Sequence, residues 1–569
     1  MNCHAPIAVR SCFVLVSAML LAFSAQCMAQ DLVHQVEAGE TIHSISQKYL
    51  ENPRQYWRVQ RHNRIADGRA LQPGATVTIP AQLLRRETVN AKAVSVNGNA
   101  NVREGDATAQ PLTVGGIVKP GSAVVTGADG SAVIELSDGS LLRIPPKSEV
   151  RLYKSQRAIG TAGATGVTNL IRLFSGRVEA LVNKLSPGNS FEITTRTAAA
   201  GVRGTDFRVS YDAAAQITRS EVLEGAVAFE GTAPANPTGE ARVKAGKDKS
   251  APVTVALVAG TGSVADRSGV PLPARALLAA PQLTGDNTAL QERPVVRFAL
   301  LAPAGAKQYR GQIGRDAGMQ TIVAENVFDS PEVKFAEIDD GEYFLRVRAI
   351  DESGLEGLNQ LQAFRLKARP EPPLTQAPAV NGKARGENAT FVWGESTEGL
   401  QYRFQLARDA AFRDLVQEEA ALKTGTLASR SLSPGNYFWR VGSVRSTGDT
   451  GPWSDVRRFT QLPPSAPPQA AESATTIEFS WPGESGQTFV FQVARDREFK
   501  SLIMDTTTPD TAATLQRPPA GFYFSRLRAV DADGFIGPFT PAQRFEVLDR
   551  IGAGNGSLNT GDGTPVRRN

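Results

Sequence analysis

An internal repeat occupies almost half of this 569-residue chain and constrains its fold more than any other feature. The segment Tyr309–Asp316 returns at Tyr402–Asp409 and again at Phe489–Asp496. A Gly-x-Tyr-Phe-x-Arg motif follows in each unit, at 341–346, 435–440 and 521–526. The period of roughly 90 residues is too long for a solenoid unit and suits a β-sandwich of about 100 residues. Side chains that alternate between two faces along these motifs are typical of strands.

The repeats resemble fibronectin type III domains. The resemblance rests on the Tyr-Phe-x-Arg strand, on Trp393 and Trp481 in an early strand, where the first repeat has Leu300, and on Gly-Pro-Trp-Ser454. We interpret the aromatic residues as core packing rather than as ligand contacts. Pro- and Ala-rich linkers separate the units. The resemblance implies three sandwiches, at 285–369, 378–462 and 468–548. The composition of residues 551–569, rich in Gly, Asn, Ser and Thr, predicts a disordered tail.

The chain is long enough for about four or five domains. Its 62 basic and 57 acidic residues give a net charge of +5 and are mixed along the sequence. A nucleic-acid-binding protein normally concentrates its basic residues on one face, so we expect no nucleic-acid partner.

The first 29 residues have the pattern of a signal peptide. Arg10 precedes an apolar run over 12–23, and Cys27-Met28-Ala29 offers a cleavage site after Ala29. A retained anchor and a lipoprotein signal are alternatives, disfavoured by polar Ser24 and Gln26. All three cysteines lie in this segment, so the mature protein would contain no thiol. We expect a periplasmic or envelope protein without a membrane span after cleavage.

Residues 31–81 have a β-α-α-β pattern. Thr41 can cap a helix whose apolar face carries residues 42, 45 and 49, and Asn52 before Pro53 can begin a second helix. Asn63 suits the end of that helix, and Gln72-Pro73-Gly74 suits a type II turn. Val36 and Val77–Ile79 would form the two strands.

This segment resembles a LysM domain, a module that binds glycans on cell-wall proteins. The resemblance covers His34–Thr41, Leu71–Gly74 and Val77–Pro80, with Glu40 where Asp is usual and a longer stretch between the helices. It implies a shallow groove for peptidoglycan or another N-acetylglucosamine-containing glycan, between two loops that offer backbone groups and an apolar floor. The implied glycan-binding residues are Gly39, Glu40, Thr41, Ile42, Ala66, Asp67, Gly68, Arg69, Ala70, Leu71 and Gln72. We interpret Trp57 as a core residue rather than a sugar platform.

Residues 88–260 alternate short apolar stretches with glycine turns. They resemble the FecR-type extracytoplasmic domain through Gly127–Gly130, Asp138–Ser140, Thr194–Thr197, Ala200–Phe207 and Glu221–Val227. Members of that family pass signals to a sigma factor through a cytoplasmic N-terminal region, where this chain has a signal peptide and the LysM-like segment. The resemblance therefore implies only the fold of this region, and not the regulation of a sigma factor. We interpret Arg203 and Asp206 as a structural pair.

Histidine usage argues against catalysis. After the predicted signal peptide, histidine occurs only at positions 34, 43 and 62. The large domains therefore lack the residues for histidine-dependent zinc sites and for Ser-His-Asp triads. A two-carboxylate glycosidase stays formally open, with Asp206 and Glu224 as candidates. We expect no enzyme, no catalytic or metal-binding residue and no cofactor.

Together these patterns predict a mostly β multidomain protein of the cell envelope. The leading hypothesis is a non-catalytic scaffold that binds peptidoglycan through the LysM-like module and presents the other domains to an envelope protein partner. The alternative is an envelope signalling or sensing component that acts through the FecR-like domain. A cell-wall glycan hydrolase, or an accessory to one, is the minor alternative.

Overall fold

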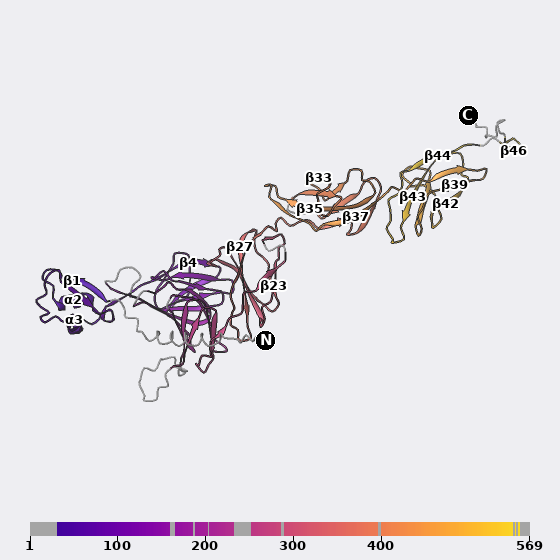
Figure 1. The fold of residues 1–569 in the computed structure, drawn as a ribbon. Coiled ribbons are helices and arrows are strands. Elements are labelled where there is room, and N and C mark those ends of the chain that lie inside the picture. The colour runs from indigo at the N-terminus through magenta and orange to yellow at the C-terminus, as the bar shows by residue number, and fades with distance from the viewer. Residues whose placement is uncertain are drawn as a thin grey trace, which may run out of the picture. The chain divides into compact units, whose positions relative to one another are not determined.

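The computed structural model describes residues 31–159, 166–185, 188–202, 204–232, 252–285, 289–396 and 400–549. Beyond them it describes only two short paired strands, β45 (Gly552–Ala553) and β46 (Gly556–Ser557). The predicted signal peptide over 1–29 and the rest of the predicted tail lie outside these residues. The described chain is mostly β, as predicted, and divides into two compact units, Met1–Leu366 and Lys367–Asn569 (Figure 1).

The N-terminal module has the predicted β-α-α-β order (Figure 1). Its two strands, β1 (Leu32–Gln35) and β2 (Thr76–Ile79), pair antiparallel. Between them in the sequence lie α2 (Ile42–Tyr49), the 3₁₀ turn η1 (Pro53–Gln55) and α3 (Tyr56–His62). A second 3₁₀ turn, η2 (Ala81–Leu83), follows. Leu83, Leu84 and Ala158 join the module's apolar core, so this core extends past residue 81.

The predicted capping residues hold the module's helices. The Ser44 backbone N–H donates to Thr41 Oγ1 at 3.1 Å, and the Thr41 N–H donates to Ser44 Oγ at 2.8 Å, which completes a reciprocal cap. The Arg54 N–H donates to Asn52 Oδ1. Asn63 links α3 to β2, because its side-chain amide donates to the carbonyl oxygen of Thr78 and accepts from the Thr78 N–H.

The interpretation of Trp57 as a core residue is wrong. Its side chain is 48% exposed, and the guanidinium of Arg61, one helical turn later, lies 5.1 Å from the ring centroid. The helix α3 is only seven residues long, and Val59 is its one buried residue. Val59 thus occupies the core-facing position, which leaves Trp57 on the outer side of the helix.

The middle region forms a closed β-barrel. Its long strand β12 pairs through its first half with β11 and β13, and through its second half with β10 and β15. Strands β19 and β20 pair onto the same structure, so the barrel continues beyond residue 260. The barrel strands are β3 (Arg86–Thr88), β4 (Ala91–Asn97), β5 (Ala100–Glu104), β6 (Gln110–Pro111), β7 (Ile117–Val118), β8 (Ser122–Thr126), β9 (Ser131–Glu135), β10 (Leu141–Ile144), β11 (Glu149–Ala158), β12 (Val167–Leu181), β13 (Ser190–Thr194), β14 (Ala198–Val202), β15 (Asp206–Asp212), β16 (Ile217–Glu224), β17 (Ala226–Gly231), β18 (Thr254–Val258), β19 (Thr261–Ala265) and β20 (Arg275–Ala276).

Each repeat folds as a sandwich of a smaller and a larger sheet. In repeat 1 these are β21 (Gln282–Thr284), β23 (Val296–Leu301) and β26 (Glu332–Phe335), against β22 (Leu290–Gln291), β28 (Gln360–Leu366), β27 (Gly341–Ile350), β24 (Gln308–Gly314) and β25 (Ile322–Phe328). In repeat 2 they are β29 (Thr375–Ala377), β31 (Thr390–Trp393) and β34 (Thr426–Ala428), against β30 (Gly382–Arg385), β37 (Arg457–Leu462), β35 (Gly435–Val444), β32 (Gln401–Ala407) and β33 (Leu415–Leu422), with β36 (Thr450–Trp453) beside β35. In repeat 3 they are β38 (Gln469–Glu472), β39 (Thr476–Ser480) and β42 (Ala512–Gln516), against β41 (Leu502–Thr508), β40 (Thr488–Ala494), β43 (Gly521–Val530) and β44 (Gln543–Val547).

Aromatic residues build the cores of the second and third sandwiches, as predicted. Trp393 and Trp481 are 2% and 5% exposed, and Leu300 of the first repeat is also buried. The tyrosine of each Gly-x-Tyr-Phe motif is buried, and its hydroxyl donates to a backbone carbonyl four residues upstream. These bonds run from Tyr343 to Asp339, from Tyr437 to Ser433 and from Tyr523 to Pro519, at 2.8, 2.9 and 2.8 Å. Such a bond ties the start of an inner strand to the preceding loop.

Candidate functional site

The two loops predicted to bind glycan lie side by side in the N-terminal module. The Ile42 N–H donates to the carbonyl oxygen of Gly68 at 2.8 Å, which joins the loop after β1 to the loop before β2. A β-carbon on Gly68 would lie 3.2 Å from that of Ile42, so glycine permits this close approach. The Ile42 side chain is buried in the core and its N–H is already bonded. Ile42 therefore belongs to the core and holds the two loops together.

Some of the other residues predicted to bind glycan have structural roles, and most of them are exposed at the surface. Gly39 has φ of +85°, and Thr41 caps α2, so both have structural roles. Glu40 accepts from the Glu37 N–H at 2.8 Å and contacts His34 Nε2 at 2.6 Å, and these two bonds lower its pKa. Leu71 packs partly against the core. Gly39, Ala66, Asp67, Arg69, Ala70 and Gln72 are exposed, and Gly68 is half-buried.

A hollow of the module lies beside the exposed Trp57. It is a cavity of ≈ 530 Å³ whose lining includes Trp57, Arg61, His62 and Gln82. None of the residues predicted to bind glycan lines it.

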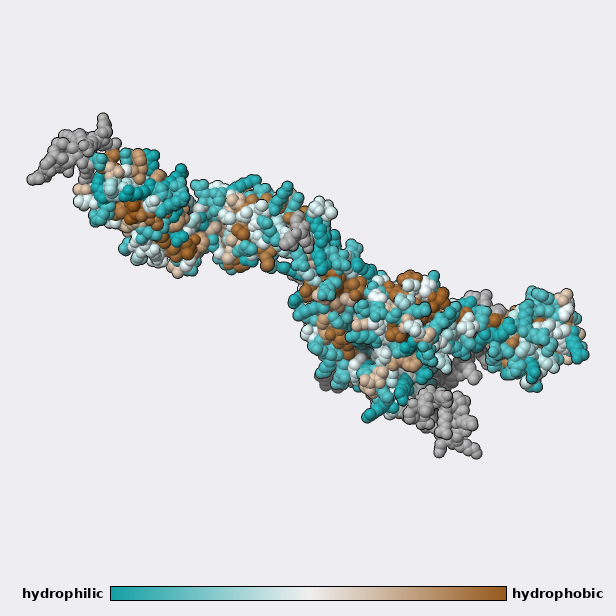
Figure 2. Space-filling model, turned by 180° about the vertical axis from the view of Figure 1, so that it is seen from behind, coloured by the Kyte–Doolittle hydropathy of each residue, from teal (hydrophilic) through white to brown (hydrophobic). Residues whose placement is uncertain are grey.

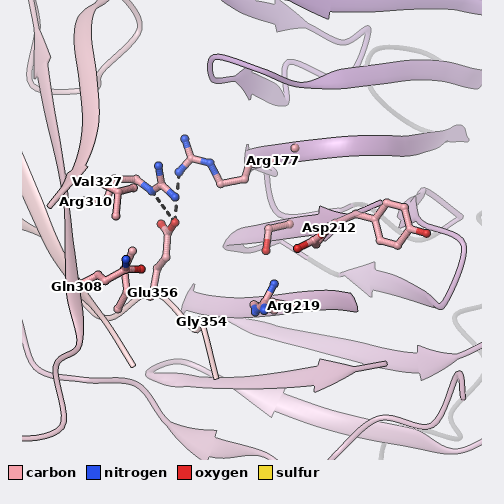
Figure 3. Close-up of a pocket in the computed structure, with 12 residues that line it drawn as sticks. Arg177, Asp212, Arg219, Gln308, Arg310, Val327, Gly354 and Glu356 are labelled. Atoms are coloured by element: carbon pink, nitrogen blue, oxygen red, sulfur yellow. Dashed lines mark hydrogen bonds and ion pairs between the residues drawn. The ribbon is translucent and has the colours of Figure 1, made fainter. Parts of the chain in front are cut away.

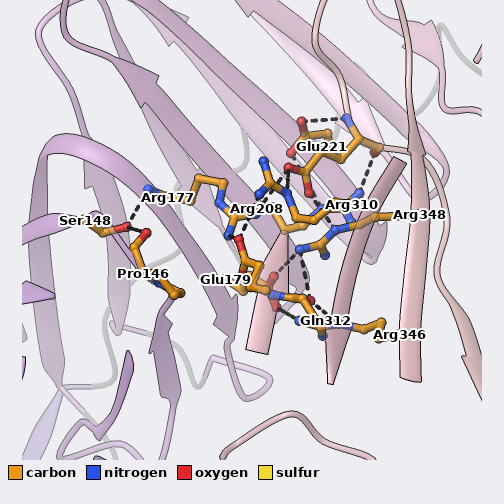
Figure 4. A network of polar contacts seen from close by, with 12 residues as sticks. Pro146, Ser148, Arg177, Glu179, Arg208, Glu221, Arg310, Gln312, Arg346 and Arg348 are labelled. Carbon is orange, nitrogen blue, oxygen red and sulfur yellow. Dashed lines mark hydrogen bonds and ion pairs between the residues drawn. The ribbon is translucent and has the colours of Figure 1, made fainter. Parts of the chain in front are cut away.

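Buried charges join the barrel to repeat 1 inside the first compact unit (Figure 4). On the barrel, Glu179, Arg208 and Glu221 stand opposite one another on β12, β15 and β16. On repeat 1, Arg348 stands opposite Arg310, and Arg346 opposite Gln312, on strands β27 and β24. We call this contact the ionic seam. Its charged residues are Arg177, Glu179, Arg208, Glu221, Arg310, Glu325, Arg346, Arg348 and Glu356.

Glu179 is the centre of the ionic seam on the barrel side. Its two carboxylate oxygens lie 2.6 Å from Arg348 Nη2 and 2.8 Å from Arg346 Nη2, and its side chain is 5% exposed. Burial raises the pKa of Glu179, but the charges of the two arginines outweigh burial, and the pKa lies well below its ordinary value. Removing one partner of such a buried pair costs about 3–5 kcal/mol, because it leaves a desolvated charge.

Glu356 is the corresponding carboxylate on repeat 1. Arg348 Nε and Arg310 Nε both lie 2.6 Å from its oxygens, and its N–H donates to Glu221 Oε1 at 3.2 Å. Arg208 of the barrel donates to the carbonyl oxygens of residues 356 and 357. Glu221 is fully enclosed, and burial raises its pKa to about 7 against the pull of Arg208. The ionic seam thus contains one carboxyl that titrates near neutral pH.

A cavity of ≈ 270 Å³ opens at the edge of the ionic seam (Figure 3). Arg177 and Arg310 both reach toward the Glu356 carboxylate there, and Arg177 Nη1 lies 3.3 Å from Glu356 Oε1 (Figure 3). Arg219 lines the same cavity, and its Nε donates to the carbonyl oxygen of Ser353. The polar walls therefore come from both the barrel and repeat 1.

The sequence did not predict the ionic seam. The charges that meet there lie up to 179 residues apart, as for Arg177 and Glu356, and no local pattern relates them. One signal was present: Glu179 lies between Val178 and Ala180 in an apolar strand, where an acidic side chain needs a partner. Of the predicted structural pair, Arg203 lies outside the described residues. Asp206 stands opposite Glu224 in the β15–β16 register, and burial raises the pKa of Asp206.

No three His, Cys, Asp or Glu side chains come together as metal ligands within the part of the chain that the structure describes. The same residues contain no helix with the length and hydropathy needed to cross a membrane.

Comparison with known families gives the class of the barrel. The FecR protein family matches residues 122–228, which includes strands β8 to β16 and the first half of β17. Glu179, Arg208 and Glu221 of the ionic seam all lie within the matched segment. The match covers the predicted FecR-like region in part and leaves the N-terminal module and the three repeats outside it.

Solved structures give more distant likenesses. Two structures of a putative anti-sigma factor from Parabacteroides distasonis ATCC 8503 are 14% and 15% identical to this chain, each with a TM-score of 0.20. Each covers 27% of this chain, which spans 59% of the length of that protein. The FN1–FN3 domains of chicken CNTN1 are 15% identical, with 48% of this chain and 98% of that chain covered and a TM-score of 0.20. No curated protein matches the chain.

Proposed function

We propose that this protein is a non-catalytic component of the cell envelope that takes part in signalling through its FecR-type barrel. The match to the FecR family over residues 122–228 is the observation that carries the proposal. The ionic seam adds a physical route for coupling, because four of its charged residues that lie in the matched segment, Arg177, Glu179, Arg208 and Glu221, contact repeat 1. In this proposal the barrel and repeat 1 act as one body that meets an envelope protein partner after export.

Transcript profiling tests this role in cells that lack the gene. A signalling component predicts a discrete set of transcripts that changes in the null strain and returns with the full chain. The variant Glu478→Gln, at an exposed position of β39, serves as the control and restores the set. Glu179→Gln, which removes the central charge of the ionic seam, restores it poorly. Identical transcripts in the null and the complemented strains would contradict the proposal.

Glycan binding by the N-terminal module is the second candidate function. The backbone bond between Ile42 and Gly68 supports it, because this bond brings the two implied loops together at an exposed surface. Peptidoglycan, or another glycan that contains N-acetylglucosamine, is the proposed ligand. In this proposal the predicted signal peptide exports the chain to the periplasm or envelope, where the module attaches it to the wall.

Sedimentation of the full chain with purified peptidoglycan tests this second function. Tryptophan at Ala66 or Ala70 would fill the groove from exposed positions, and we expect about tenfold weaker binding. Val33→Trp is the matched control, because Val33 is exposed on β1, outside both loops. Equal sedimentation of all three variants, or of a chain without residues 31–84, would exclude this groove while leaving the signalling role open.

A further inference from the structure

The three repeats place the same polar pair on the outer face of their larger sheets. In each repeat a glutamine on one inner strand stands opposite an arginine on the next, and the arginine Nε donates to the glutamine Oε1. These pairs are Arg346 with Gln312, Arg440 with Gln405 and Arg526 with Gln492, at 2.8, 2.9 and 2.8 Å. A further arginine flanks each pair, namely Arg348, Arg403 and Arg528. We call these surfaces the arginine faces.

In repeat 1 another domain covers the arginine face. The Nη2 atoms of Arg346 and Arg348 bind Glu179 of the barrel, and these two arginine side chains are 8% and 1% exposed. This contact shows what the face fits: a β-sheet surface that presents a buried carboxylate.

In repeats 2 and 3 the corresponding arginines stack on aromatic rings of their own repeat. The Arg440 guanidinium lies 3.9 Å from the ring centroid of Phe412 and 4.6 Å from that of Trp453. Arg526 lies between Phe499 and Phe539 at 4.0 and 4.1 Å. These stacks leave the arginine faces of repeats 2 and 3 partly exposed.

In repeat 1, Asn359 stands at the position of Phe539, one of the two aromatic residues that stack on Arg526 in repeat 3. The backbone register identifies the position, because Gly357 and Gly537, two residues before Asn359 and Phe539, make the same bond to Ala349 and Ala529. Asn359 Oδ1 accepts from Arg208 of the barrel and from Arg348. The side chain that replaces this ring at the covered face therefore contacts the barrel.

The two remaining arginine faces have the composition of a protein-binding surface. Arginine and large aromatic residues are enriched at the centres of interfaces, and a guanidinium is weakly hydrated and binds carboxylates in a bidentate manner. Repeat 3 also exposes the apolar side chains of Leu502, Phe522 and Ile536. Figure 2, which draws one face of the molecule, shows apolar side chains among hydrophilic ones on that face.

We propose that the arginine faces of repeats 2 and 3 bind a protein partner that presents a carboxylate from the surface of a β-sheet, as Glu179 of the barrel does toward repeat 1. Charge complementarity and the covered face of repeat 1 support this occupant. The proposal holds independently of the signalling role of the barrel.

Site-specific photocrosslinking in cells tests the proposal with the full chain. A photoreactive phenylalanine at Gln401 or Val490 lies on the same strand face as the paired glutamines Gln405 and Gln492 of repeats 2 and 3. Positions Thr390 and Glu478, exposed on the smaller sheets, are the controls. We expect crosslinks to a protein from the first two positions only, and the crosslinked peptides should carry Asp or Glu.

Charge variants separate binding from folding. Arg440→Gln together with Arg526→Gln should lower the crosslink yield about tenfold or more, because each removes a charge that pairs with a carboxylate. Arg413→Gln with Arg497→Gln makes the same charge change at exposed loop positions and should leave the yield unchanged. Arg440→Lys with Arg526→Lys should restore part of the yield. If the first variant lowers the thermal midpoint, Arg528→Gln, which spares the glutamine pair, replaces it.

Three outcomes would overturn the proposal. Equal crosslinking from the control positions would show that the arginine faces have no special role. Crosslinks to a glycan or nucleic acid, or to peptides without acidic residues, would show that the occupant is different. An unchanged yield in the glutamine variants, with the fold intact, would show that the arginines serve only their aromatic stacks.

Discussion

Glu179 illustrates, at the scale of one residue, how burial and charge compete. Water is excluded from its carboxylate, which alone would favour the protonated form. Arg346 and Arg348 reverse this preference, since both lie within hydrogen-bonding distance. The ionised form of Glu179 is therefore stabilised by residues of another domain.

Glu179→Gln should destabilise the barrel and repeat 1 by about 3–5 kcal/mol, because it leaves two buried arginines short of a counter-ion. Chemical denaturation of the full chain measures this change. Glu149→Gln is the control: Glu149 pairs with Arg103 at 2.8 Å, but both side chains are about a third exposed. Its loss should cost under about 1 kcal/mol. Equal effects of both substitutions would contradict the strength assigned to the ionic seam.

Glu221 should make stability fall as pH rises toward neutral. Its pKa is about 7 in the folded protein and near the ordinary 4.5 when unfolded, so the folded state binds the proton more tightly. The stabilisation is fully present below about pH 4.5 and is lost as pH rises through 7. Glu356 and Arg208 are the charged groups that face this carboxyl.

Denaturation midpoints at several pH values between 5 and 8 measure this dependence. Glu221→Gln keeps the shape without the titration, so its midpoint should vary less across this window. A midpoint that rises with pH in the unaltered protein, or that varies equally in both, would show that Glu221 does not titrate here.

At the scale of elements, β27, β35 and β43 are the best-predicted strands. Each begins at the Gly-x-Tyr-Phe motif, and each motif tyrosine is buried. In β43 buried and half-buried side chains alternate, because one face of the strand lies against the core, and the sequence records this alternation. The helix α3 shows the limit, because a seven-residue amphipathic helix has too few turns to reveal which side Trp57 faces.

Tyr437→Phe should destabilise repeat 2 by about 0.5–1.5 kcal/mol, because the Ser433 carbonyl loses its donor while the ring stays packed. Thermal unfolding of the second unit measures the effect. Tyr153→Phe removes a hydroxyl from a side chain that is 55% exposed, and should change stability little. If Tyr437→Phe is silent, this bond does not tie the strand to the preceding loop.

At the scale of the whole molecule, the barrel and repeat 1 share one compact unit. The ionic seam is not their only contact: Asn97 donates to the carbonyl oxygen of Ile322, and Arg219 to that of Ser353. We therefore expect the two domains to unfold together, although their sequences predict separate domains.

Hydrogen exchange of the full chain tests this coupling. Strands β24 and β27 should be protected to the same degree as β12 and β15 of the barrel, and Glu179→Gln should lower the protection of β24 and β27 first. Glu149→Gln should leave protection unchanged. Strands of repeat 1 that exchange much faster than the barrel in the unaltered protein would show that the two domains open independently.

The sequence was sufficient to predict the mostly β fold, the threefold repeat and the turn chemistry of the N-terminal module. Those features depend on neighbours within a few residues, such as Thr41 with Ser44 or Tyr437 with Ser433, and local periodicity records them. The ionic seam required the folded chain, because Glu179 and Arg348 become neighbours only when two domains pack together. Long-range charge pairing leaves no periodic trace, so only the three-dimensional arrangement shows why these arginines are buried.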